Sequence, residues 1–158
     1  MKYTLTVFTE NKAGVLNRIS DLLVRRKINV DTLTVSTTER EGISRFTIVV
    51  DVNADQVEKV VKQIYKVIEV IKVYESTDQD LVFKEIAFYK ITCIDGTKRS
   101  ELQSLATVLK AEIIHVEANN LVIQKTGSEA EIDHVFKLLF PFGIQEFIRS
   151  GRIAVRKN

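Results

Sequence analysis

Apolar and polar positions alternate with a period that changes along the chain, and this period predicts the order of its elements. A period near two predicts a strand over residues 3–9, and the spacing typical of one helical face follows over residues 14–27. Residues 30–36 and 44–51 are rich in β-branched side chains, with a hairpin loop predicted at residues 38–42.

A second helix and a fourth strand complete the first half. Asn53 is a candidate N-cap, and Gln56 stands three residues later, which is the spacing of a capping box. A strand is predicted over residues 67–74. The order over residues 1–75 is therefore βαββαβ.

The second half repeats this order. Ser100 and Gln103 are expected to cap its first helix, Ser128 and Glu131 its second, and the Asn119–Asn120 pair suits the turn of a hairpin. The strands are predicted over residues 84–93, 112–117, 121–125 and 144–155, and Pro141 is expected to end the last helix.

Two copies of a split βαβ unit predict an α+β protein with two ferredoxin-like βαββαβ domains in tandem, over residues 1–77 and 78–158. Each sheet has one face without helices. A domain this small often needs a partner to cover such a face, so we expect an oligomer, and a homodimer in particular.

Composition excludes several classes of protein. The 158 residues are 45% hydrophobic and 28% charged, with a net charge of +2 that indicates no polyanionic partner. No apolar run approaches the roughly 20 residues of a membrane-spanning helix. Cys93 is the single cysteine, and the N-terminus does not resemble a signal peptide, so we expect a cytoplasmic protein.

No arrangement of side chains indicates catalysis. His115 and His134 lie on different predicted elements, and neither belongs to a cluster with metal-ligand spacing. Phosphate-binding glycine motifs are absent from the sequence, and Phe46 is the one aromatic residue on a strand where an RNA-binding sheet needs several. We predict no catalytic residue and no metal site, which leaves only an active site assembled between chains as an enzymatic alternative.

The segment between the first strand and the first helix has the features of a ligand site. Gly14 at a helix start leaves backbone N–H groups accessible to a carboxylate, and the amides of Asn11 and Asn29 add polar groups. Val15, Leu16 and Val35 are candidates to line an apolar pocket. These residues suit a free amino acid, but alone they are equally explained by a turn and a helix cap.

The same segment carries a family resemblance. Residues 9–19 (TENKAGVLNRI), 25–35 (RRKINVDTLTV) and 44–50 (SRFTIVV) resemble the regulatory small subunits of acetolactate synthase, also called acetohydroxyacid synthase. The second half is similar to that family's C-terminal domain in length and element order. The first half resembles an ACT domain, a module that binds amino acids between paired copies.

The resemblance implies a non-catalytic subunit that activates a catalytic large subunit in branched-chain amino-acid biosynthesis and confers feedback inhibition by valine. It implies no cofactor on this chain, with thiamine diphosphate, Mg and FAD on the large subunit. The implied effector site combines one loop with a residue of the other subunit: Asn11, Ala13, Gly14, Val15 and Leu16, together with Asn29.

Two positions depart from the family pattern. Lys27 stands where glycine is usual, so the end of the first helix is expected to differ, and Asp31 replaces a longer glutamate. These departures leave open which branched-chain amino acid is the effector, because one methylene changes binding by only about 1 to 3 kcal/mol. A free-standing ACT-type sensor that controls a different enzyme or a transcription factor is the alternative function.

Overall fold

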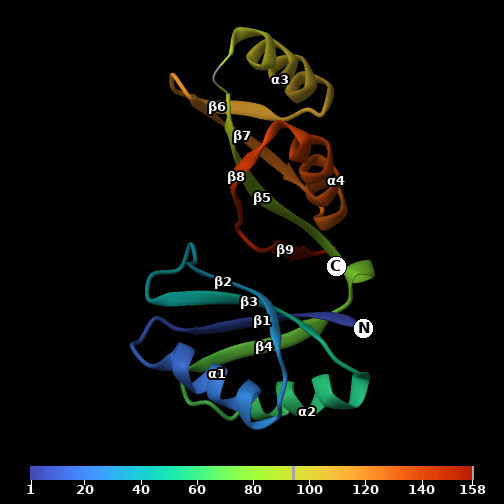
Figure 1. The fold of residues 1–158 in the computed structure, drawn as a ribbon. Helices are drawn as coiled ribbons and strands as arrows, with labels where there is room; N and C mark the ends of the chain where they lie inside the picture. Colours follow the sequence, from blue (N-terminus) through green and yellow to red (C-terminus); the bar gives the residue numbers. More distant parts are fainter. Residues whose placement is uncertain (94, 158) are drawn as a thin grey trace. The chain divides into compact units, whose positions relative to one another are not determined.

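The chain is divided into two compact units. The computed structural model describes residues 1–93 and 95–157. The first unit comprises Met1–Phe83 and Arg152–Asn158, and the second comprises Lys84–Gly151 (Figure 1). The contacts thus place the division after Phe83, whereas the sequence places it between residues 77 and 78, and they group the C-terminal segment with the first unit.

The first unit contains the predicted βαββαβ order. Its elements are β1 (Lys2–Glu10), α1 (Val15–Arg25), β2 (Val30–Thr37), β3 (Ile43–Asp51), α2 (Ala54–Ile64) and β4 (Val70–Ser76). The strands form an antiparallel sheet in the order β2-β3-β1-β4, and both helices cover one face of it (Figure 1). This is the ferredoxin-like arrangement that the sequence predicts, and the prediction is confirmed.

The pleat of the central strands separates an apolar face from a polar one. Leu5 and Val7 of β1 are buried against the helices, in one core cluster with Ile48 of β3. The side chains that alternate with them, including Thr4 and Thr6, point to the helix-free face and are nevertheless buried. A sheet face that water does not reach needs its own cover.

The C-terminal strand lies on this helix-free face. Arg152 is 1% exposed, and its guanidinium donates to Asp78 Oδ1 at 2.6 Å and to Thr4 Oγ1 at 3.2 Å. Its Cζ lies 4.0 Å from the centre of the Phe83 ring. Arg45 on β3 donates to the carbonyl of Ala154, so the strand is attached along its length.

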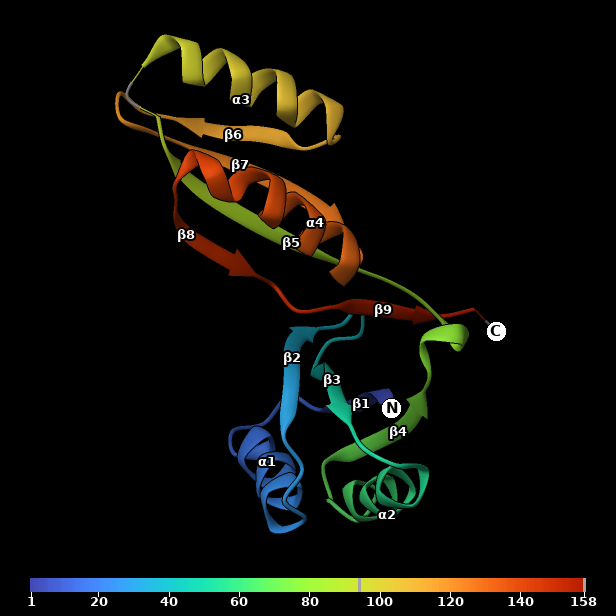
Figure 2. The ribbon, with the colours of Figure 1, turned by 45° about the vertical axis from the view of Figure 1, so that its right-hand side comes forward.

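The predicted strand over residues 144–155 is therefore wrong as a single element. The structure has β8 (Ile144–Arg149) and β9 (Ile153–Arg156), which are separated at Gly151, where φ is 74°. The left-handed backbone at this glycine turns the chain, and β9 pairs with the start of β5 within the first unit (Figure 2).

The second unit has the same architecture. Its elements are β5 (Leu81–Thr92), α3 (Gly96–Val108), β6 (Glu112–Val116), β7 (Asn120–Gly127), α4 (Glu129–Leu139) and β8, in the sheet order β6-β7-β5-β8. Leu81, Val82 and Phe83, at the start of β5, belong to the first unit. A 3₁₀ turn (Phe140–Phe142) contains Pro141 and ends α4 as predicted.

Helix N-termini follow the predicted caps in two of three cases. Capping boxes are confirmed at α2, with Asn53 and Gln56, and at α4, with Ser128 and Glu131. The box predicted at Ser100 and Gln103 is wrong because α3 begins one turn earlier, where Asp95 Oδ1 accepts the backbone N–H of Lys98 at 2.7 Å. Ser100 lies inside the helix and donates its hydroxyl to the carbonyl of Gly96.

The hairpin predicted between β6 and β7 is present, but it needs no positive φ at Asn119 or Asn120. In the described residues, the positive φ values outside glycine occur at Lys27 (54°) and Lys110 (51°), just beyond α1 and α3. The expectation that Lys27 changes the end of α1 is wrong, because Lys27 adopts the left-handed conformation itself. Ile28 N–H donates to the carbonyl of Leu23, which completes a Schellman motif.

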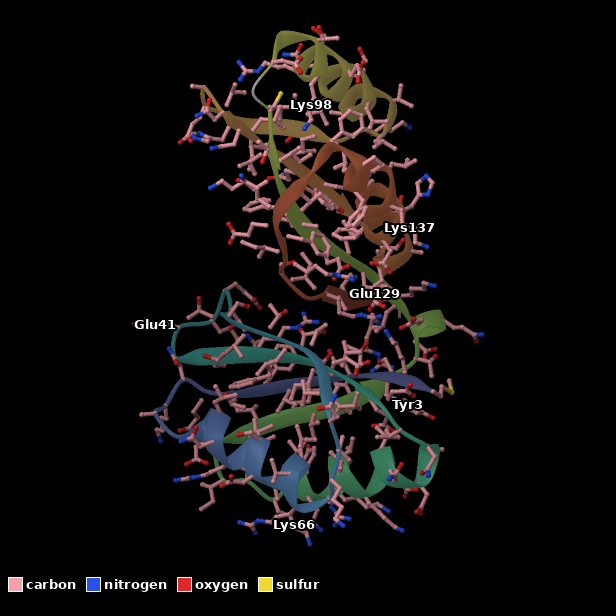
Figure 3. All side chains as sticks on the ribbon, viewed as in Figure 1. Tyr3, Glu41, Lys66, Lys98, Glu129 and Lys137 are labelled. Atoms are coloured by element: carbon pink, nitrogen blue, oxygen red, sulfur yellow. The ribbon has the colours of Figure 1, made fainter. Side chains whose placement is uncertain are left out.

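Charged side chains project from the outer faces of both units (Figure 3). Lys66, after α2, and Lys137, on α4, are examples, and both are exposed. Within the described ranges, no helix is long and apolar enough to cross a membrane.

Candidate functional site

The loop between β1 and α1 is fastened at both sides. The backbone N–H of Asn11 donates to the carbonyl of Gly42 at 2.8 Å, which ties the loop to the hairpin between β2 and β3. The N–H of Glu10 donates to the carbonyl of Glu69 at 2.8 Å, just before β4. The loop therefore holds a defined position at one end of the sheet.

Gly14 is the N-cap of α1 and has a left-handed backbone, with φ 85° and ψ −10°. A Cβ built at this position meets no atom within 4 Å, so space does not demand glycine. The backbone conformation does, because a side chain is strained at this φ. The first amides of α1 are consequently presented without a side chain at the cap.

The N-terminus of α1 differs from the other helix starts in residues 1–93 and 95–157. Side chains of Asn53, Asp95 and Ser128 cap α2, α3 and α4, whereas Gly14 provides no side-chain cap and the first turn of α1 holds no acidic residue. The N–H groups of this first turn have no partner within the helix and lie at the positive end of its dipole. They can bind an anion such as a carboxylate.

Two carboxylates near the loop are paired with cations. Lys12 pairs with Glu10, whose hydrogen bond raises the pKa of the Lys12 ammonium. Arg18 pairs with Glu69, and the pKa of the Glu69 carboxyl is lowered by its own backbone N–H and by the hydrogen bond from Arg18. These pairs reduce the repulsion that an anion would meet at the start of α1.

The structure brings most of the predicted loop residues together. Asn11, Ala13, Gly14 and Leu16 are exposed on the loop and the first turn. Val15 is 2% exposed and belongs to the core, so its side chain is not accessible to line a pocket and only its backbone N–H is available to a ligand.

Asn29 lies apart from this loop within one chain. It follows the C-terminal end of α1, and the 11 residues of this helix span roughly 16 Å. Asp31, two residues further, places its carboxylate 3.9 Å from the ammonium of Lys2. Asn29 can join the loop only from another chain.

An apolar surface borders the loop along β2. Leu33 and Val35 lie on the helix side of the sheet, opposite Ile48 and Phe46, but are 41% and 46% exposed. Leu16 and Val24 on α1 are 43% and 70% exposed. Leu33 was not predicted at this surface, because its alternation is that of a core residue and only the position of β2 at the sheet edge exposes it. Val24 was not predicted either, because it stands outside the apolar face of α1 that the sequence period marks.

The fold and the loop together define an ACT-type regulatory module joined to a second ferredoxin-like unit. Residues 5–72 match the family described as the AHAS small subunit-like ACT domain, and residues 84–158 match the family described as the small subunit of acetolactate synthase. The chain belongs to the acetolactate synthase small subunits, and is a regulatory rather than a catalytic type of subunit.

Individual relatives are similar to this chain over its whole length. It is 40% identical over 159 residues to a probable acetolactate synthase small subunit of Archaeoglobus fulgidus, covering 100% of this chain and 99% of the relative. It is 37% identical to the acetolactate synthase small subunit of Bacillus subtilis, with 100% and 92% covered. The crystal structure of the small subunit from Thermotoga maritima matches with a TM-score of 0.91, 27% identity and 100% and 98% coverage.

Side chains suited to metal binding are not grouped in the part of the chain that the structure describes. No three of the His, Cys, Asp and Glu side chains there are placed to hold one ion.

Proposed function

We propose that this chain activates the catalytic large subunit of acetolactate synthase in the cytoplasm and confers feedback inhibition by valine. The observation that carries the proposal is the N-terminus of α1, which begins after Gly14 and has no side-chain cap. In this proposal the chain itself is non-catalytic and binds no cofactor, and thiamine diphosphate, Mg²⁺ and FAD belong to the large subunit.

The effector's carboxylate is proposed to accept hydrogen bonds from the first-turn amides of α1 and from the side chain of Asn11. Such charge-assisted bonds are stronger than neutral ones. The exposed Leu16 and Val35 provide apolar contacts for a branched side chain. Valine, leucine and isoleucine share this chemistry, and the family points to valine.

Pairing of two chains along β2 is proposed to complete the site. β2 is the edge of its sheet and carries exposed apolar side chains, as expected for a surface that a second copy covers. Thr37 lies opposite Ser44 and Glu10 opposite Ile43, so the C-terminal end of β2 shares one end of the sheet with the loop.

The symmetry of such a pair decides which residues meet. Two edge strands related by a twofold axis run antiparallel, so the start of one β2 lies beside the end of the other. Asn29 of the partner subunit then approaches Val35 and the loop of the first chain. This explains how a residue at the far end of α1 can share a site with Asn11.

Inhibition requires that valine favour one arrangement of the dimer over another. A coupling free energy of about 1 to 3 kcal/mol changes the activity of a two-state partner by roughly 5- to 150-fold. Reconstitution tests this: the purified chain should raise acetolactate formation by its cognate large subunit, and valine should lower it. No effect of the chain on that activity would contradict the proposal.

Asn11→Asp tests the site itself. The added carboxylate lies beside the bound carboxylate, and two such charges about 4 Å apart repel by roughly 4 kcal/mol at an effective dielectric constant near 20, before screening. The variant should activate the large subunit but lose valine inhibition. Asn119→Asp adds the same charge to an exposed turn of the second unit and is the matched control. Gly14→Asp is a poorer test, because φ at Gly14 is 85° and the variant is strained.

A further inference from the structure

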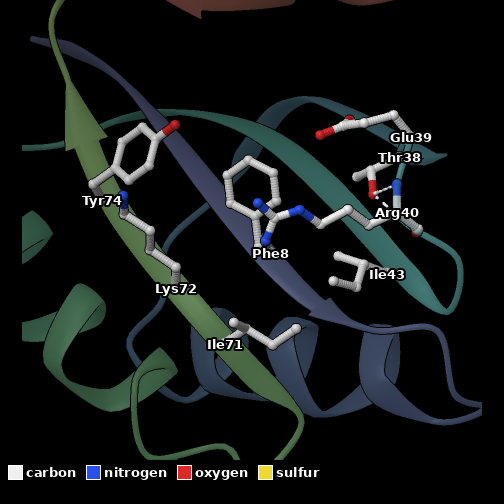
Figure 4. A pocket seen from close by; sticks show the side chains of 8 residues that line it. All are labelled: Phe8, Thr38, Glu39, Arg40, Ile43, Ile71, Lys72 and Tyr74. Carbon is white, nitrogen blue, oxygen red and sulfur yellow. Dashed lines mark hydrogen bonds between the residues drawn. The ribbon is translucent and has the colours of Figure 1, made fainter.

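A pocket lies on the face of the first unit's sheet opposite α1 and α2. It has a volume of about 320 Å³ and is lined by side chains of β1, β4 and the hairpin between β2 and β3 (Figure 4): Phe8, Thr38, Glu39, Arg40, Ile43, Ile71, Lys72 and Tyr74. The volume is near the lower end of the range of small-molecule sites, about 300 to 1,000 Å³. It suits a compact ligand rather than a dinucleotide.

The floor of this pocket is apolar and partly aromatic. Phe8 comes from β1, Ile43 from the start of β3, and Ile71 and Tyr74 from β4. The Phe8 and Tyr74 rings are tilted by 43°, with their centres 6.4 Å apart. The rings are too close to admit a third ring between them, so a ligand would lie across the floor formed by Phe8 and the two isoleucines.

Two cations enter the pocket from different sides. Arg40 extends from the hairpin over the floor, and Lys72 approaches from β4 (Figure 4). Among the described residues, neither has an acidic side chain within ion-pair distance, although Lys72 Nζ lies 5.3 Å from the centre of the Tyr74 ring. Arg45 and Arg156 lie nearby, over the Phe8 and Tyr74 rings at 5.5 and 4.9 Å.

The charges around the pocket indicate the sign of the charge that its ligand carries. Arg40 and Lys72 contribute two positive charges to the lining, and Glu39 contributes one negative charge. The lining is therefore net positive, and Arg45 and Arg156 over the floor rings add to this positive charge, so the pocket favours an anionic ligand. A guanidinium binds a carboxylate through two parallel hydrogen bonds, and the floor accepts an apolar group.

We propose that this pocket binds a small carboxylate with an aromatic or branched apolar body, such as a 2-oxo acid or an amino acid. Arg40 holds the carboxylate, Lys72 adds a second positive charge, and the body packs on Phe8, Ile43 and Ile71. The site lies on the opposite face of the sheet from the start of α1, so its occupancy is separable from that of the proposed valine site.

A titration of the full-length, ¹⁵N-labelled chain with 3-phenylpropanoate tests the proposal. Amide shifts should map to residues 8, 38–43 and 71–74, and Arg40→Gln should weaken binding at least tenfold. Lys66→Gln removes an exposed cation of the same unit outside the pocket and should leave the dissociation constant unchanged. Uncharged 3-phenylpropanol should bind at least tenfold more weakly than the carboxylate.

Phenylpyruvate and phenylalanine distinguish the two sources of the carboxylate. If phenylalanine binds more tightly, Glu39 accepts a hydrogen bond from its ammonium group. If phenylpyruvate binds more tightly, Glu39 makes no such bond and the ligand is a 2-oxo acid. Both results support a small carboxylate as the ligand. Absence of shifts at these residues, equal affinity of the Arg40→Gln variant, or tighter binding of phenyl phosphate would each overturn it. A separate titration with valine should shift the amide signals of residues 11–16 and so reports on the proposed effector site.

Discussion

Lys27 offers a sharp test of how this fold tolerates strain. It occupies the left-handed position after α1 with φ 54°, and its backbone N–H donates to the carbonyl of Val24 at 2.9 Å. The hydrogen bonds of the motif involve only backbone atoms, so glycine can make them equally well. Lys27→Gly should therefore keep the helix end and remove the strain of a side chain in this conformation.

The expected difference in stability between the glycine and alanine variants follows from two contributions. A left-handed backbone costs a non-glycine residue about 1 to 2 kcal/mol. Glycine returns about 0.4 to 1 kcal/mol of this through its greater freedom in the unfolded chain. Both Lys27→Gly and Lys27→Ala remove the positive charge at the helix end, so the comparison of these two variants isolates the backbone. The glycine variant should be more stable than the alanine variant by about 1 kcal/mol.

Urea denaturation followed by far-ultraviolet circular dichroism measures this difference, and a thermal shift of roughly 4 to 8 °C should accompany it in a unit of this size. Lys110, with φ 51° after α3, repeats the motif in the second unit, so Lys110→Gly should give a similar gain. A Lys27→Gly variant that is no more stable than Lys27→Ala would refute the reasoning.

Three further changes test other features. Asp95→Ala should lower the free energy of unfolding by about 0.5 to 2 kcal/mol through loss of the α3 cap, whereas Ser100→Ala should change it little; equal effects in urea denaturation would contradict the assigned helix start. The pKa of the Glu131 carboxyl is lowered to about 2, first by the backbone N–H of Ser128, so its stabilising effect is present above the ordinary value near 4.5 and is lost as pH falls toward 2. The difference in stability between the parent and Glu131→Gln, measured by urea titrations from pH 6 to pH 2, should accordingly shrink, and a constant difference would argue against this. Arg152→Met should destabilise the first unit by roughly 2 to 3 kcal/mol, and a loss under about 0.5 kcal/mol would show that its buried hydrogen bonds contribute little.

Features set by near neighbours in the chain were predictable. The capping boxes at Asn53 and at Ser128 join residues three positions apart, and the hydrophobic period fixes the helices behind them. The start of α3 was missed because its first turn, from Gly96, holds no apolar residue, so the period becomes visible only at Leu102.

Features set by distant residues were not predictable. The period over residues 144–155 does not reveal a break, because the break is set by distant partners: β9 pairs with β5, and Arg152 just before it contacts residues 74 and 148 positions away. At the candidate site, Gly14 and its neighbours follow from local backbone chemistry. The sequence showed that Val15 is apolar, but only the packed structure shows that its side chain is used by the core.

The return of β9 to the first unit has a consequence for the order of synthesis. A ribosome delivers β1 to β4 first, then the whole of Lys84–Gly151, and only at the end the residues that cover the helix-free face. Until Arg152 emerges, Thr4 and its neighbours on that face remain in contact with water or with chaperones. The N-terminal unit of this protein is thus begun before the second unit and completed only after the second unit has been synthesised.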